Sequence, residues 1–134
     1  MPTSVERVIQ QLNDASDGSV AHKKIRTLHK LAEQGDEKSF QGLIVYMQFG
    51  KIDHVRTYVC SLISEMVNAQ TCGQLVDIFR RGLQDDALRY WSIAGLAVTA
   101  GSDSYRDLLA IALNEDCRVE ERAKVSRRMY FCHS

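Results

Sequence analysis

Apolar residues recur along this chain at intervals of three and four positions, the spacing that places side chains on one face of an α-helix. Short polar or glycine-containing stretches separate eight such segments. Their apolar positions span residues 5–12, 21–32, 40–47, 55–66, 75–79, 88–97, 108–113 and 119–129. Nowhere do Val, Ile and Thr alternate with polar residues between turn residues, as they do in a half-buried strand. The pattern predicts an all-α chain of eight helices.

Polar residues and glycines mark the ends of these helices. Thr3 and Glu6 form a capping-box pattern, in which each side chain binds the other residue's backbone N–H. We expect side-chain caps at the first, second, fourth and sixth helices, from Thr3, Ser19, Asp53 and either Asp85 or Asp86. Thr71 should open the fifth helix. Gly35 is expected to end the second helix in the left-handed conformation. Because the turns are short, sequential helices should be antiparallel.

Gly95 lies inside a predicted helix. A glycine there costs about 1 kcal/mol relative to alanine. We therefore predict that a neighbouring helix approaches closely at this position. The approach of a partner's backbone is the alternative.

The helices repeat with a period of 33 residues. The segment from Asp53 to Tyr58 and the segment from Asp86 to Trp91 share the pattern Asp, any residue, aliphatic, Arg, any residue, aromatic, and Arg122 lies 33 residues beyond Arg89. The helices before them align at the same offset: Leu43 with Val76 and Leu109, Val45 with Ile78 and Ile111, and Tyr46 with Phe79 and Ala112. A fixed period built from helix pairs predicts an α-solenoid.

The repeated unit resembles a HEAT repeat, in which an Asp begins the second helix and an aliphatic–Arg pair follows. Asp53, Val55 and Arg56 fit that pattern, and residues 86–96 match it best. No unit has the proline often found in the first helix, and Val119 stands where the last unit should have Asp. The resemblance implies a single domain that forms a right-handed solenoid of about four helix pairs, with units of approximately 3–35, 36–69, 70–101 and 102–134.

Composition and charge narrow the function. The chain has 134 residues, enough for one domain, and its 17 basic residues balance 17 acidic ones, so its overall field does not attract nucleic acid. It lacks a secretion-signal pattern and an apolar run of the ~20 residues that span a bilayer, so we expect a cytoplasmic protein. The four cysteines form no Cys-x-x-Cys pair and are predicted to be buried free thiols.

No residue set indicates catalysis. The four histidines show no metal-ligand pattern, and the paired acids fall near predicted helix starts, where they stabilise the helix dipole. There is no nucleophile elbow and no glycine-rich phosphate loop. The sequence therefore predicts no enzyme, no cofactor and no metal. Basic clusters at residues 22–24, 80–81 and 127–128 leave nucleic-acid binding as a lesser alternative.

The predicted fold suggests a protein-binding module, because solenoids present a concave surface formed mainly by the second helix of each pair. Candidate partner-binding residues on those helices and at their starts are Asp53, Arg56, Tyr58, Asp85, Asp86, Arg89, Tyr90, Trp91 and Arg122. Structural bonds between neighbouring units are the alternative for the Asp and Arg residues, and burial is the alternative for Tyr58 and Trp91. The chain resembles small bacterial HEAT-like immunity proteins, so the first hypothesis is an immunity protein that binds and sterically blocks a toxin from the same gene cluster. A general adaptor or scaffold is the second hypothesis, and a lyase accessory is a third.

Overall fold

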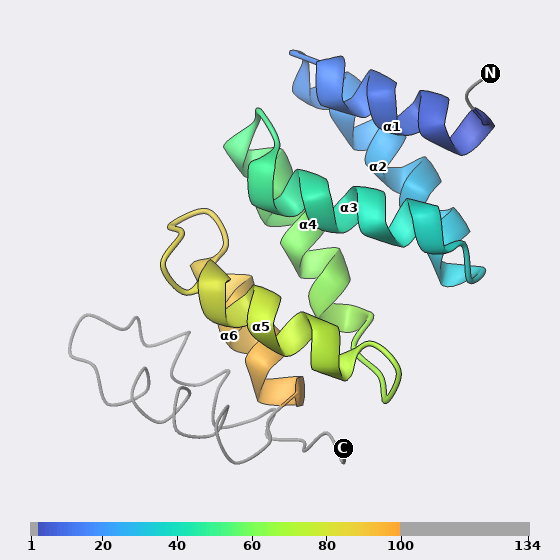
Figure 1. The fold of residues 1–134 in the computed structure, drawn as a ribbon. Coiled ribbons are helices and arrows are strands. Elements are labelled where there is room, and N and C mark those ends of the chain that lie inside the picture. The colour runs from blue at the N-terminus through green and yellow to red at the C-terminus, as the bar shows by residue number, and fades with distance from the viewer. Residues whose placement is uncertain (1–2, 100–134) are drawn as a thin grey trace. The chain divides into compact units, whose positions relative to one another are not determined.

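The structure of this chain, a computed structural model, describes residues 3–99, which form six α-helices and no strand (Figure 1). The helices are α1 (Ser4–Asp14), α2 (Gly18–Glu33), α3 (Glu37–Phe49), α4 (Asp53–Glu65), α5 (Cys72–Gly82) and α6 (Arg89–Thr99). They confirm the all-α prediction in this range. The seventh and eighth predicted helices lie outside the described residues. None of these six helices is long and apolar enough to cross a membrane.

The chain groups into two compact units, Met1–Ile63 and Ser64–Ser134, which we call unit 1 and unit 2. Unit 1 contains α1, α2, α3 and nearly all of α4, whereas the described part of unit 2 contains α5 and α6.

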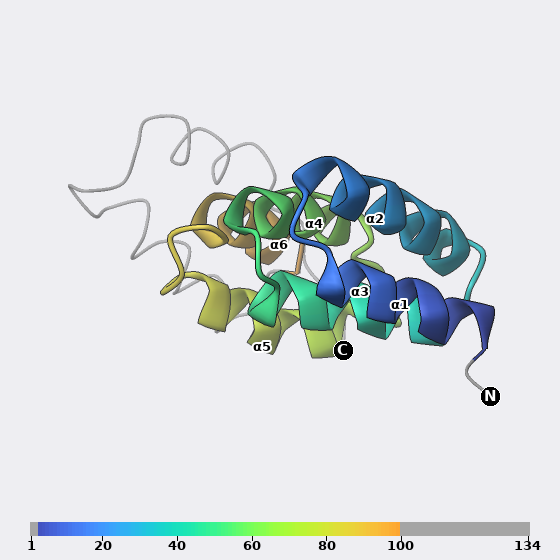
Figure 2. The ribbon, with the colours of Figure 1, turned by 90° about the horizontal axis from the view of Figure 1, so that it is seen from above.

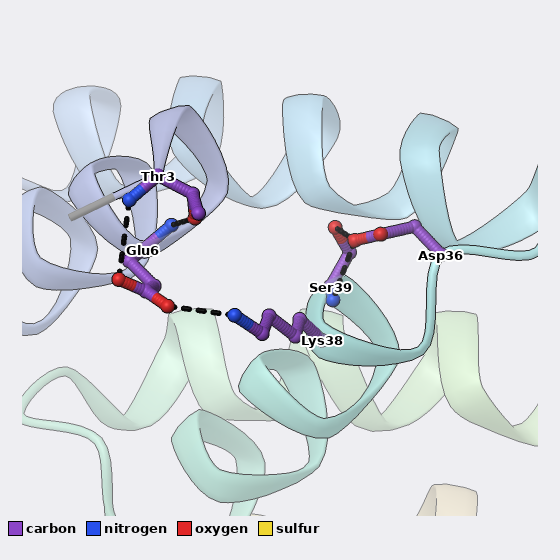
Figure 3. A network of polar contacts seen from close by, with 5 residues as sticks. All are labelled: Thr3, Glu6, Asp36, Lys38 and Ser39. Carbon is purple, nitrogen blue, oxygen red and sulfur yellow. Dashed lines mark hydrogen bonds and ion pairs between the residues drawn. The ribbon is translucent and has the colours of Figure 1, made fainter.

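Side-chain caps begin the first two helices. Glu6 N donates to Thr3 Oγ1 and Thr3 N donates to Glu6 Oε2, both at 3.1 Å, which confirms the predicted capping box (Figure 3). The expectation that Ser19 caps α2 is wrong, because the Asp17 carboxylate accepts from Ser19 N at 2.8 Å and from Ser19 Oγ at 2.9 Å. A charged acceptor binds these donors more strongly than a hydroxyl does. Gly35, with φ of 98°, confirms the predicted left-handed end of α2.

An ion pair joins α1 to α3. Lys38 Nζ lies 2.7 Å from Glu6 Oε1, so Glu6 both caps its own helix and contacts the next one in its layer (Figure 3). The hydrogen bond from Lys38 lowers the pKa of Glu6, and the same bond raises the pKa of Lys38. Asp36 caps α3 by accepting from Ser39 N at 2.9 Å and from Ser39 Oγ, and these two bonds lower its pKa.

The helices of unit 1 form two layers, with α1 beside α3 and α2 beside α4 (Figure 2). Helix α2 packs against both α1 and α3. Neighbours within a layer run parallel, because contacts advance in the same direction along both helices: His54 meets Gly18, and Tyr58 meets His22. The core contains completely buried side chains from each helix, including Leu12, Ala21, Ile25, Leu28, Leu43, Val55, Val59 and Ile63.

Close packing of α5 against α6 defines unit 2. A Cβ on Gly95 would lie 2.5 Å from Cζ and 2.6 Å from Cδ2 of Phe79, which confirms the close helix approach predicted at this glycine. Thr71 precedes α5 as predicted but makes no side-chain cap. Its Oγ1 accepts from Asn68 N at 2.9 Å and donates to Met66 O at 3.1 Å. The α5–α6 contact therefore depends on the absence of a side chain at position 95.

The 33-residue period is visible in the burial of the second helices. Each of the following pairs, one residue on α4 and one on or just before α6, is buried at both positions: Val55 and Leu88, Val59 and Ser92, Cys60 and Ile93, Ile63 and Leu96, Ser64 and Ala97. This agreement, together with the packing of adjacent helices, is compatible with a helical repeat.

The first helices follow a period one residue shorter. At the predicted offset of 33, Leu43 is buried but Val76 is half-buried, and Val45 is exposed where Ile78 is buried. An offset of 32 instead joins buried positions at four places, Phe40 with Cys72, Leu43 with Leu75, Tyr46 with Ile78, and Met47 with Phe79, whereas an offset of 33 retains Tyr46 with Phe79. The predicted alignment of α3 with α5 is therefore wrong by one residue. The connection that leads from α5 into α6 absorbs the difference.

The cysteines only partly follow the prediction. Cys60 is a buried free thiol, as expected. Cys72 takes part in a disulfide bond, so the prediction of a free thiol is wrong there. Spacing along the chain does not reveal which sulfur atoms the fold brings within bonding distance.

Candidate protein-binding surface

Arg56 lies at the connection between α3 and α4 and is only 8% exposed. Its Nε donates to Met47 O at 2.9 Å and its Nη2 donates to Gln48 O at 3.1 Å. These carbonyls belong to the last turn of α3, where backbone acceptors have no partner within the helix. The guanidinium therefore caps the C-terminus of α3 and suits the negative end of its dipole.

Asp53 completes this arrangement from the surface. Its Oδ1 lies 3.1 Å from Arg56 Nη1, and its side chain is 81% exposed. The expectation that Asp53 caps α4 is wrong by one residue, because Ile52 O accepts the first N–H groups of that helix, from Val55 at 3.1 Å and Arg56 at 3.0 Å. Asp53 and Arg56 thus act mainly within one helical hairpin, and Asp53 alone presents a charge to solvent.

Tyr58 lies one turn further along α4 and is half-buried. Its ring stacks on the His22 ring of α2, with centroids 4.4 Å apart and planes at 23°. His54, which is exposed, borders Gly18 at the start of α2, where an added Cβ would lie 2.8 Å from its Nε2. Two successive contacts therefore hold α2 and α4 together and leave part of each aromatic ring in solvent.

In unit 2, the acids predicted as candidates precede α6. Asp85 Oδ1 accepts from Ala87 N at 3.1 Å, and Asp85 O accepts from Arg89 N at 2.8 Å. Asp85 therefore opens the turn that leads into the helix. Asp86, which aligns with Asp53 at an offset of 33, is exposed, and Arg89 is half-buried.

Tyr90 and Trp91 form an edge-to-face pair at the start of α6. Their ring centroids lie 5.0 Å apart at an interplanar angle of 82°, and both residues are half-buried. Such pairs are stable geometries for aromatic rings. Arg122, the last predicted candidate, lies outside the described residues.

Sequence reasoning missed two exposed features of unit 1. Val45 and Phe49 are one turn apart on α3 and are 49% and 78% exposed, and Phe49 stands off the apolar stripe that predicts the helix. His29 and Glu33 form a histidine–carboxylate contact of 3.4 Å at a spacing of four, which the survey of histidine spacing overlooked. Within residues 3–99, no group of three His, Cys, Asp or Glu side chains is placed to hold a metal ion.

A buried hydroxyl lies beside the Arg56 bonds. Tyr46 is 1% exposed, and its hydroxyl has no hydrogen-bond partner among the described residues. Burial raises the pKa of this phenol. The backbone N–H of Ile52, which lies near the hydroxyl, and to a smaller extent the charge of Arg56 oppose that rise. The Tyr46 side chain is packed against the end of α3, where its ring would lie 2.6 Å from a Cβ added at Gly50.

Comparison of the chain with models of known protein families, with curated protein sequences and with solved structures finds no match. The resemblance to HEAT repeats therefore depends on the sequence pattern.

Proposed function

We propose that this protein is a cytoplasmic immunity protein that binds a cognate toxin and blocks it sterically. In this proposal the chain forms a right-handed solenoid of HEAT-like helix pairs, and the second helices supply the binding surface. The toxin would come from the same gene cluster, and capture would require no chemistry from this chain.

The observation that carries the proposal is the repetition of a partly exposed aromatic residue on the second helices. Tyr58 on α4 and Trp91 on α6 are 33 residues apart, and both are half-buried. Each also contacts another ring, which limits the conformational freedom that binding would remove. Partly buried Tyr, Trp and Arg side chains supply much of the binding energy in protein interfaces.

Charged groups flank these rings. Asp53 presents a carboxylate at the start of α4, and Asp86 does so before α6. Charges at the rim of an interface mainly accelerate association and select the partner. An immunity protein must capture its toxin quickly, so this arrangement suits the proposal.

Co-expression with the product of a toxin-like neighbouring gene tests the function directly. We expect the protein to restore growth and the purified pair to form a 1:1 complex with a Kd of about 1 nM or lower, as measured by calorimetry. Tyr90→Ala should weaken binding by about thirtyfold or more if the ring is an anchor, because that corresponds to ~2 kcal/mol. Lys51→Ala, at an exposed residue of the α3–α4 connection, is the control and should bind like the wild type.

Other outcomes would redirect the assignment. Micromolar binding to several unrelated proteins, without rescue of growth, would favour the adaptor or scaffold hypothesis. Measurable turnover by the purified chain would contradict the proposal.

A further inference from the structure

The outer face of α2 concentrates positive charge. Lys23, Arg26 and Lys30 are exposed and follow one another at intervals of three and four residues, so they share one side of the helix. We call these three residues the α2 basic face. The opposite side of α2 carries its completely buried residues, Ala21, Ile25 and Leu28. Packing against α1 and α3 therefore turns the three charges toward solvent.

These cations form no ion pair within 4 Å among residues 3–99, and the same is true of the exposed Arg7, Lys51 and Arg81, which do not share one helix face. Exposed Lys38, by contrast, pairs with Glu6 at 2.7 Å. Lys23 exerts only the weakest of the influences that lower the pKa of the Asp17 carboxylate. Glu33, three residues after Lys30, contacts His29 instead, at 3.4 Å. The charges are thus available to an outside partner.

Helix stability does not account for this placement. The spacing of the α2 basic face brings like charges next to each other, which destabilises a helix. Only Lys30 lies in the last turn, where a cation suits the helix dipole, and the first turn contains no acidic residue. Lys23 and Arg26 gain neither an ion pair nor a dipole interaction from the described fold.

The α2 basic face is continuous with the aromatic residue of the proposed binding surface. His22 immediately precedes Lys23, and its ring stacks on Tyr58 of α4 at 4.4 Å. Both helices belong to the same layer of unit 1 (Figure 2). A partner that contacts Tyr58 would therefore lie next to the basic side chains.

We propose that the α2 basic face docks onto an acidic surface of the protein partner. This inference rests on the proposed function and names the chemistry of the partner's contact. An acidic protein fits better than nucleic acid because one face of the Tyr58 ring is already covered by His22 and is closed to a stacked base.

The test uses the full chain and two fluorescent probes, a labelled polyglutamate peptide and a short labelled DNA duplex, with binding followed by anisotropy. The test variant is Lys23→Glu/Arg26→Glu/Lys30→Glu. The control variant is Arg7→Glu/Lys51→Glu/Arg81→Glu, which changes the net charge equally at exposed positions elsewhere. Circular dichroism checks that both variants keep the wild-type helix content. The same proteins are then assayed against the toxin.

We expect the wild type and the control to bind polyglutamate equally and the test variant to bind at least about tenfold more weakly. Equal losses in both variants would overturn the inference, because net charge alone would then explain binding. No polyglutamate binding by the wild type, or tighter binding of the DNA duplex than of polyglutamate, would also overturn it. If the toxin binds the test variant as tightly as the wild type, the inference fails while the immunity function stands. If polyglutamate selects the face but no toxin binds, the proposed function fails instead.

Discussion

Replacing Gly95 with alanine tests the packing of unit 2 most sharply, because two known effects oppose each other there. Alanine is the better helix former, so an isolated α6 would gain stability from the change. In the folded chain the new Cβ would lie 2.5 Å from Cζ and 2.6 Å from Cδ2 of Phe79. Real Cβ atoms do not approach other atoms so closely, so either the Phe79 ring or the helix must move.

The magnitude follows from the surroundings of that ring. Phe79 is completely buried, so it cannot move into solvent and must displace its neighbours. Adding a methyl group to a packed core costs about 1–3 kcal/mol. The gain in helix propensity returns about 1 kcal/mol. We therefore expect Gly95→Ala to lower the free energy of unfolding by up to about 2 kcal/mol.

Gly73 supplies a matched control within the same unit. It lies in α5, is exposed, and has no atom within 4 Å of an added Cβ. Gly73→Ala should therefore raise the free energy of unfolding by about 0.4–1 kcal/mol. Urea denaturation followed by the fluorescence of Trp91, the single tryptophan and a residue of α6, measures both variants.

A double-mutant cycle with Phe79→Leu identifies the atom responsible. The smaller side chain should leave room for the Cβ, so Gly95→Ala should cost at least about 1 kcal/mol less in that background. Stabilisation by Gly95→Ala alone, to the same extent as by Gly73→Ala, would refute the close approach of the two helices.

Three further changes test unit 1. Arg56→Met should lower the free energy of unfolding by about 3 kcal/mol, because it leaves buried carbonyls without donors, and a urea midpoint within error of the wild type would contradict this. Tyr46→Phe should raise stability by about 1 kcal/mol, whereas a loss would mean that the hydroxyl is bonded. Because burial raises the pKa of Tyr46, the wild type should also lose stability as pH rises above about 10, and the Phe variant should lose less. The pKa of Glu6 is lower in the folded chain than its ordinary value of 4.5, so its ion pair stabilises the fold above that pH, and this contribution is lost as pH falls through the folded pKa. A difference between wild type and Glu6→Gln that persists at low pH would argue against the ion pair with Lys38.

The sequence predicted the helices well because their apolar spacing is a local property of the chain. The capping box at Thr3 and the left-handed Gly35 were predictable for the same reason, since each involves neighbouring residues only. Gly95 was predictable because a costly residue inside a helix requires a compensating contact.

The errors arise where the sequence offered equivalent local choices. Asp17 and Ser19 are both good caps, and the start of α2 at Gly18 selects Asp17. The 32-residue offset of α3 and α5 was hidden because several aliphatic residues stand next to one another, as Leu75 and Val76 do. Only burial shows that Leu75 is the core residue. The sequence showed a basic cluster at residues 22–24, which contains only Lys23 of the α2 basic face, and the lack of ion pairs at that face is a property of the fold.

The repeated motif and the binding surface should be separable by mutation. The motif arginine Arg56 suggested an interface residue, yet its donors bind backbone carbonyls of its own hairpin. Its loss should therefore lower stability, and any loss of partner binding should follow from unfolding. The α2 basic face contributes no ion pair to the described fold, and its own like charges repel. Charge reversal at a single position, such as Arg26→Glu, should weaken partner binding. The urea midpoint should stay unchanged or rise, because the new glutamate would lie next to the remaining cations. A midpoint that falls with Arg26→Glu would show that these cations stabilise the fold and would remove the argument that they are held for a partner.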